Sequence, residues 1–241
     1  MKRFWKEVAV TPKLGIALDA RPVRTPGRAP LILPTPALAE AVAAEWLAVG
    51  DTVDPRAMPL TGLANAAIDR IAPDREAFAA GIARYGENDL LYYRAESPPE
   101  LVARQQAAWD PVLAWARRRY DVHFEPTCGV MHRAQPAATI ARLAEATAAL
   151  DPWTLAPVSP LVTLSGSLLL ALALVEDELD PDQAWAAAHV DEDWQAEQWG
   201  DDPLAADRRA HRRREFDAAV LFLNSLSSQE REGAERSSAE G

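Results

Sequence analysis

The amino-acid sequence predicts an α+β fold, with a small N-terminal domain of sheet plus helices followed by an all-α domain. Three observations predict it. Patterns typical of short strands are concentrated in residues 4–33, helical patterns occupy most of the rest, and ESPPE at residues 96–100 interrupts the chain. We therefore expect an N-terminal domain over residues 1–95, a helical domain over residues 96–226, and a mobile polar tail over residues 227–241.

The N-terminal domain begins with strand patterns that are separated by turn residues. WKEVAVTP and GIALDARPVRTP flank a turn around Gly15, and Ile16 and Leu18 alternate with other residues as in a half-buried strand. LILP, at residues 31–34, predicts a third short strand. DLLYYR, at residues 89–94, is again strand-like and could return to this sheet.

Helical patterns follow the strands. In the first of them, Leu38, Val42, Trp46 and Val49 recur at helical spacing and form one apolar stripe. The most apolar stretch, residues 161–175, is too short and too interrupted by Thr and Ser to span a bilayer, so we expect a buried helix there. The expected helices cover residues 36–50, 58–71, 74–85, 99–121, 137–149, 153–177, 181–199 and 204–226, and residues 122–136 form a loop or short hairpin.

Charge and composition exclude several classes of partner. The chain has 25 basic and 36 acidic residues and a net charge of −11, whereas binding to nucleic acid or to an anionic membrane requires a positive surface. We expect neither nucleic-acid binding nor membrane insertion. The single cysteine, Cys128, excludes an internal disulfide framework and favours a reducing compartment. The N-terminus lacks the apolar run of a secretory signal, and the Ala- and Arg-rich composition is typical of a high-GC bacterium, so we expect a cytoplasmic protein of a bacterium.

The motifs of common enzyme classes are missing from the sequence. It contains no GxxxxGK[ST] phosphate loop, no GxGxxG after a strand, and no HExxH, GxSxG or CxxC. We therefore expect no cofactor, no metal site and no catalytic residue. The alternative is a hydrolase that uses Cys128 with His132, because an imidazole can activate a nearby thiol. A small buried thiol and a surface imidazole would explain the same two residues.

VDEDWQAEQWGDD, at residues 190–202, places two tryptophans among many acids. On one continuous helix with the preceding residues, Trp185 and Trp199 flank Glu192 on one face, while Trp194 lies on the opposite side. A carboxylate in an apolar face is costly unless it is paired. Glu192 therefore forms a salt bridge with an arginine of a neighbouring helix, accepts an indole N–H, or makes a polar contact at a protein interface.

Two further features bear on function. Five arginines between residues 208 and 214 could bind an anion, but the acids that precede them favour a solvated, self-complementary helix face. The chain also has eight tryptophans, and exposed aromatics are favoured anchors at protein interfaces. Trp46 is ambiguous, because the apolar stripe that contains it favours a position in the core.

Segments along most of the chain carry a resemblance to a known family. They are RFWKEVAV (3–10), LDARPVRTP (18–26), LPTPALAEAVAAEW (33–46), MPLTGLANAAID (58–69), NDLLYYRAESPPELVARQQAAWDPVLAW (88–115), SGSLLLALAL (165–174) and VDEDWQAEQWGDD (190–202). In this order they resemble the assembly chaperones for the catalytic sector of F-type ATP synthase, the family that attends the alpha subunit. In mitochondria this family works in the matrix, and alphaproteobacteria carry relatives.

The resemblance implies a fold, a partner and a site. The fold would be an N-terminal α+β layer followed by an orthogonal helical bundle. The protein would bind newly made, unassembled alpha subunit without a nucleotide of its own, and would cover a surface that a beta subunit later takes. A monomer is favoured, and a helical scaffold for another client is the alternative. The implied client-binding candidates are Glu192, Trp194, Gln195, Trp199, Asp191, Asp193 and Trp46.

Overall fold

The computed structural model describes residues 2–129, 131–200 and 202–239, with side chains as far as residue 227. Contacts divide the chain into two compact units, which are described one at a time. Unit 1 comprises residues 1–74, 152–157 and 218–241, and unit 2 comprises residues 75–151 and 158–217. These ranges differ from the domains expected from the sequence. Whether residues 1–95 and 96–226 fold independently stays a prediction.

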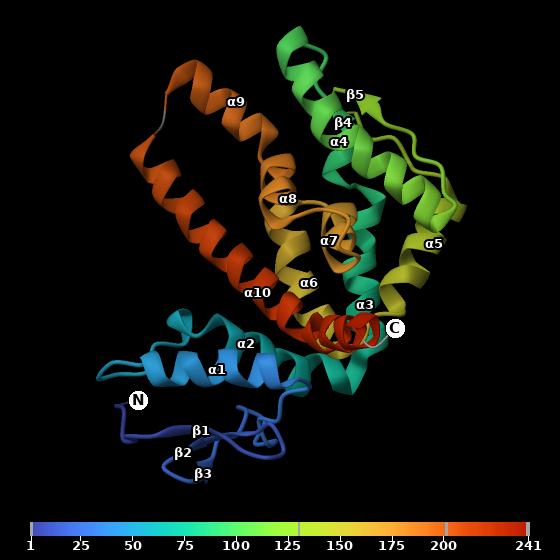
Figure 1. Ribbon diagram of the computed structural model, residues 1–241. Coiled ribbons are helices and arrows are strands. Elements are labelled where there is room, and N and C mark those ends of the chain that lie inside the picture. Colours follow the sequence, from blue (N-terminus) through green and yellow to red (C-terminus); the bar gives the residue numbers. More distant parts are fainter. Residues whose placement is uncertain (1, 130, 201, 240–241) are drawn as a thin grey trace. The chain divides into compact units, whose positions relative to one another are not determined.

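Unit 1 contains a three-stranded antiparallel sheet in the order β1-β2-β3 (Figure 1). The strands are β1 (Val8–Val10), β2 (Ile16–Leu18) and β3 (Arg21–Pro22). A tight turn joins β2 to β3, with positive φ angles at Asp19 and Ala20. The prediction of a strand at residues 31–34 is wrong, because only an isolated bridge between Gly15 and Ile32 forms there. Pro30 and Pro34 bracket this segment and have no N–H to donate to a strand ladder.

Two helices follow the sheet, the first packed on the strands and the second packed on the first helix, and both contribute residues to the unit 1 core (Figure 1). They are α1 (Pro36–Ala48) and α2 (Pro59–Ala66). Helix α2 continues as a π-helical turn at Ala67–Ile71 and a 3-10 turn at Ala72–Asp74. The Thr35 side chain caps α1 by accepting from the Leu38 N–H at 3.2 Å, and its hydroxyl donates to the Ser225 carbonyl at 2.6 Å. Phe222 lies in the same core, so the chain returns to unit 1 near its C-terminus.

Unit 2 is mainly helical. Its elements are α3 (Arg75–Ala83), β4 (Tyr93–Arg94), α4 (Pro99–Tyr120), β5 (Thr127–Cys128), α5 (Ala137–Ala148), α7 (Leu168–Val175), α8 (Pro181–Ala188) and α9 (Val190–Trp199), together with most of α6 (Pro152–Ser165) and the first part of α10 (Pro203–Ala239). The structure confirms the expected fold class. Among the described residues, no helix combines the length and apolar character that crossing a membrane requires.

The strand-like sequence at residues 89–94 does not join the N-terminal sheet. Asp89 is fully buried, and its carboxylate accepts the N–H groups of Leu91 and Leu169, each at 3.0 Å. These bonds fold residues 90–92 into a 3-10 turn, which leaves only β4 extended. β4 pairs in parallel with β5, within the region expected to be a loop or hairpin.

Two helices that the sequence predicts as continuous are each interrupted. Gly166, with a φ of 69°, separates α6 from α7, and the Ser167 side chain caps α7. His189, with φ −120° and ψ 16°, separates α8 from α9. α10 extends to Ala239 and so runs into the segment predicted as a mobile tail, of which residues 240–241 lie outside the described residues.

Candidate client-binding surface

Helix α9 carries six of the seven candidate residues, and it has no buried residue of its own. Its position follows from α8, which begins with a complete capping box formed by Asp180 and Gln183. At the junction of the two helices the His189 carbonyl accepts the Asp193 N–H at 2.8 Å. The apolar side chains of α9, such as Val190 and Trp194, are at most half-buried, so polar contacts contribute to holding the helix on unit 2.

His189 anchors the junction between α8 and α9. Its ring is buried and stacks on Trp185 with 3.8 Å between centroids, and Nδ1 lies 2.8 Å from the Trp185 carbonyl oxygen. Because a carbonyl only accepts, Nδ1 carries the proton and donates it. Burial of the imidazole lowers the pKa of His189, against the opposing effect of the hydrogen bond to Trp185.

Three acids of α9 are paired with arginines of neighbouring helices. Glu192 receives both of its hydrogen bonds from Nη2 of Arg212 on α10, at 3.0 and 2.7 Å. Asp193 is paired with Arg209, also on α10. Glu197 is held from the other side by Arg104 of α4, whose two terminal nitrogens each donate at 2.7 Å. The pairs confirm that the arginine cluster complements the preceding acidic segment.

Glu192 and Trp199 line the same groove beside α9, as the sequence predicts for one face of a helix. Trp185 precedes the break at His189, so the prediction of one continuous helix that joins Trp185 to this face is wrong. The Glu192 side chain is 48% exposed and forms a salt bridge with an arginine of a neighbouring helix, which was one of the alternatives. Partial burial raises the pKa of Glu192, but the Arg212 guanidinium outweighs it, and the pKa is lowered.

Asp191 is fixed by a buried amide. Gln105 of α4 donates from Nε2 to Asp191 Oδ1 at 2.7 Å, and its Oε1 accepts the Ala95 N–H at 2.7 Å. The main-chain carbonyl oxygen of Gln105 accepts from Nη1 of Arg94 at 3.1 Å. The nitrogen and the oxygen of the side-chain amide are each hydrogen-bonded, and the amide presents the Asp191 carboxylate in a fixed orientation.

Grooves flank α9 on both sides. The α9–α10 groove has a volume of about 790 Å³, and Glu192, Gln195 and Trp199 contribute to its lining with the start of α10. The aromatic groove has a volume of about 390 Å³ and lies between α9 and the segment around β4 and the start of α4. The aromatic groove is lined by Tyr93, Arg94, Ala95, Ser97, Pro98, Leu101, Gln105, Gly129, Asp191, Trp194, Gln195 and Trp199.

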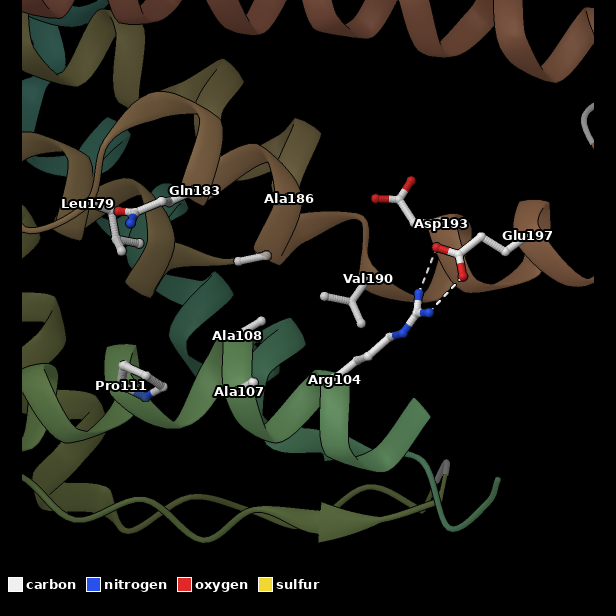
Figure 2. A pocket seen from close by; sticks show the side chains of 11 residues that line it. Arg104, Ala107, Ala108, Pro111, Leu179, Gln183, Ala186, Val190, Asp193 and Glu197 are labelled. Atoms are coloured by element: carbon white, nitrogen blue, oxygen red, sulfur yellow. Dashed lines mark hydrogen bonds and ion pairs between the residues drawn. The ribbon is translucent and has the colours of Figure 1, made fainter. Parts of the chain in front are cut away.

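A third groove, the α4–α8 groove, lies between α4, α8 and α9 (Figure 2). Its volume is about 440 Å³, and small apolar side chains such as Ala107 and Ala186 form its walls. In Figure 2, Arg104 extends from α4 to Glu197 and closes one end of the groove. The Arg104 guanidinium also lies 4.9 Å from the centroid of the Trp194 ring. The two helices are thus joined by an ion pair and a cation–π contact.

The structure brings the α9 candidates together on one helix, but their exposure to solvent differs. Trp199 is 78% exposed and lines both the α9–α10 groove and the aromatic groove, as Gln195 does. Trp194 is half-buried beneath Arg104. Trp46 belongs to unit 1, is only 9% exposed and packs edge-on against Trp5 with 5.4 Å between centroids. Its environment is that of a core residue.

Sequence reasoning missed Arg104, Glu197 and Leu204. Leu204 is 72% exposed at the start of α10, close in sequence to Trp199. No local signal links Arg104 to Glu197, because their pairing depends on how α4 packs against α9. Leu204 had a signal: it is an apolar residue that follows the helix-starting pair Asp202 and Pro203.

The Cys128–His132 pair has no supporting geometry. Cys128 is exposed on β5, and the His132 Nδ1 lies 3.3 Å from the Tyr93 hydroxyl. No contact between the thiol and the imidazole is found in residues 2–129 and 131–200. Across the described part of the chain, no group of three or more His, Cys, Asp or Glu side chains is arranged to hold a metal ion.

Comparison with known proteins identifies the family. The sequence profile of the ATP12 chaperone protein matches residues 2–117. Atp12 from Paracoccus denitrificans is 41% identical, its crystal structure matches with a TM-score of 0.87, and the match covers 93% of this chain and 98% of that chain. The chain belongs to the ATP12 chaperone family.

A second solved structure supports the same assignment. A candidate chaperone from Agrobacterium tumefaciens is 46% identical and matches with a TM-score of 0.86, over 93% of this chain and 86% of that chain. Membership of the ATP12 family confirms the expected class, a chaperone in ATP synthase assembly.

Proposed function

We propose that this chain binds the unassembled alpha subunit of ATP synthase through the surface formed by α9 and the grooves beside it. The observation that carries the proposal is the match to Atp12 along almost the whole of both chains. The resemblance of the acidic-aromatic segment to that of the family supports a client contact on Asp191–Trp199.

The α9 surface has the chemistry that such a client requires. An isolated subunit exposes apolar area that is buried in the complete assembly, and such patches aggregate. Trp199 and Leu204 are the exposed apolar anchors, at 78% and 72% exposure. Exposed tryptophan beside grooves is typical of residues that contribute most of the binding energy at interfaces. The chaperone would shield the patch until assembly.

The negative charge of unit 2 is suited to binding a basic client surface. Residues 158–217 of unit 2 contain 14 acidic and five basic residues, so this part carries most of the net negative charge of the chain. Such a field speeds association with a basic surface and keeps the complex soluble. The beta subunit then displaces the chaperone, because the permanent interface between subunits is larger.

Several finer features belong to the same proposal. The chaperone acts without ATPase activity or any other enzymatic activity of its own, as a monomer in the bacterial cytoplasm. The sequence without a phosphate-binding loop is compatible with this. The exposed Cys128, whose thiol has no described contact with His132, gives no support to the hydrolase alternative.

The test is a binding assay with purified alpha subunit from the same organism. Complex formation is measured by size-exclusion chromatography, and suppression of aggregation by light scattering. Wild type is compared with Glu192→Lys, after circular dichroism confirms that both are folded. The proposal requires wild type to form a complex and suppress scattering. If wild type does neither, the proposed client is wrong.

A charge swap separates contact from support at Glu192. Glu192→Lys places a cation beside Arg212, and adding Arg212→Glu restores the ion pair with reversed polarity. If Glu192 contacts the client, both the single and the double variant lose binding. If Glu192 only fixes α9, the double variant binds like wild type. Glu40→Lys is the matched control, because Glu40 is an exposed acid of α1 in unit 1.

A further inference from the structure

We propose that the aromatic groove binds an arginine side chain, presented by the client between apolar residues, with Asp191 as its counter-ion. This inference rests on the proposed function and specifies the client segment that the α9 surface takes. The occupant is a basic, apolar-flanked segment of a protein. Its recognition follows from the walls of the groove, its floor and its charges.

The walls of the groove are aromatic and apolar. Trp194 and Trp199 form the side that belongs to α9, and Tyr93, Pro98 and Leu101 contribute to the opposite side. Indole faces attract cations, and a planar guanidinium stacks on them better than an ammonium does. The chain itself provides an instance from the neighbouring α4–α8 groove, where the Arg104 guanidinium lies 4.9 Å from the Trp194 ring centroid.

The floor of the groove presents a carboxylate. Asp191 is half-buried and accepts one hydrogen bond, at Oδ1, from the buried amide of Gln105. Among the described residues, no cationic side chain is paired with Asp191, whereas Glu192, Asp193 and Glu197 all have arginine partners. A partly desolvated carboxylate that has no cation beside it is stabilised most when a binding partner supplies the cation.

The other charged groups at the groove do not compensate Asp191. Arg94 lines the groove, but its guanidinium is held by Asp110 at 2.7 Å and lies 5.0 Å from the Trp109 ring centroid, so its charge is already used. Glu96 adds negative charge at the end formed by Gly129, where a Cβ atom would lie 3.1 Å from Glu96 Oε1. The groove therefore favours a cation.

The size of the groove limits the occupant. A volume of about 390 Å³ accommodates one or two side chains and excludes a folded helix. An arginine fits this space with its aliphatic stem along Leu101 and Trp199 and its guanidinium at Asp191. Anionic occupants are excluded by the same carboxylate.

The first arm of the test uses a defined probe. A fluorescently labelled peptide that alternates leucine and arginine is titrated with the full chain and followed by anisotropy. Its matched control replaces each arginine with citrulline, which has the same shape but no charge. We expect the arginine peptide to bind at least roughly tenfold more tightly. Equal binding of the two peptides, or no binding of the arginine peptide, overturns the inference.

The second arm locates the site. Asp191→Asn keeps an oxygen that can accept from Gln105, so the fold around it is retained, and it should weaken binding of the arginine peptide roughly tenfold. Trp199→Ala, at an exposed position, should weaken it as well. Glu100→Gln, an exposed acid in the first turn of α4 that does not line the groove, is the control. Equal binding by wild type and Asp191→Asn overturns the inference.

The third arm repeats the comparison with purified alpha subunit. Loss of affinity in Asp191→Asn and not in Glu100→Gln supports the inference. If the alpha subunit binds wild type and Asp191→Asn equally, the client is not held through this groove and the inference fails, while the proposed function stands. If wild type binds the arginine peptide but not the alpha subunit, the inference stands and the proposed client is wrong.

Discussion

Arg104 joins α4 to α9 through Glu197, with a 2.7 Å hydrogen bond from each of its terminal nitrogens. The same guanidinium lies over the ring of Trp194. One side chain thus closes an end of the α4–α8 groove and fixes the tryptophan that lines the aromatic groove. Because α9 has no fully buried residue, this contact helps to orient Trp194.

We therefore expect Arg104→Ala to loosen α9 without unfolding unit 2. Removing the guanidinium eliminates the ion pair with Glu197 and the stacking on Trp194, while the buried core is untouched. Hydrogen–deuterium exchange should become faster in Val190–Trp199, with little change in the thermal midpoint. Arg142→Ala, which removes the exposed pair with Glu145, is the control. Unchanged exchange in α9 would show that Arg104 does not hold it.

The sequence predicts those parts of the fold whose cause lies in neighbouring residues. The two helix interruptions, at Gly166 and His189, illustrate the limit. Gly166, between two serines, adopts a positive φ that glycine tolerates, so the end of α6 could have been predicted. The break at His189 lies in AAAHVDEDW, which contains neither Gly nor Pro. There the cause is the packing of the His189 ring on Trp185, which sequence reasoning cannot see.

Local and non-local signals also differ at the candidate surface. Composition and the family resemblance indicate the segment that forms α9, and the sequence predicts that the acids and arginines near it complement each other. Their partners could not be derived, because Arg104 is 93 residues from Glu197 along the chain. The strand prediction for residues 89–94 fails for a non-local reason, because Asp89 bonds to the N-terminus of α7 and prevents residues 90–92 from staying extended. The error at residues 31–34 has a local cause, the prolines at positions 30 and 34.

Asp89 should make stability fall as pH rises from about 4 to 6. Burial raises the pKa of this carboxyl from 3.8 to about 6, although hydrogen bonds from Leu169 and Leu91 oppose the shift. Between these values the folded state binds the proton more tightly than the unfolded state, so folding is favoured at the acidic end. A shift of this size corresponds to roughly 3 kcal/mol.

The measurement is urea unfolding of wild type and Asp89→Asn at several pH values. The difference between their free energies of unfolding should change across this window and stay constant above it. Asp51→Asn, at an exposed position, is the control. Parallel curves for wild type and Asp89→Asn would contradict the prediction.

His189 should have the opposite effect on stability. Burial lowers the pKa of its imidazole below 6.5, even though the hydrogen bond to Trp185 and the charge of Glu192 raise it, and Arg209 and Arg212 lower it further. As pH falls below 6.5 the unfolded state takes up a proton first, so stability decreases. NMR titration of the His189 ring should give a pKa below 6.5. A pKa at or above 6.5 would contradict the burial argument.

Trp199 and Trp46 should respond to truncation in opposite ways. Trp199→Ala removes an exposed side chain, so the free energy of unfolding should change by less than about 0.5 kcal/mol while affinity for the alpha subunit falls. Trp46→Ala leaves a cavity beside Trp5 and should cost about 3–5 kcal/mol of stability. Urea unfolding and alpha-subunit binding of both variants, the latter at a temperature where both are folded, measure the difference. Loss of binding by a folded Trp46→Ala variant would return Trp46 to the client-binding residues, because damage to the core alone should spare α9 in unit 2.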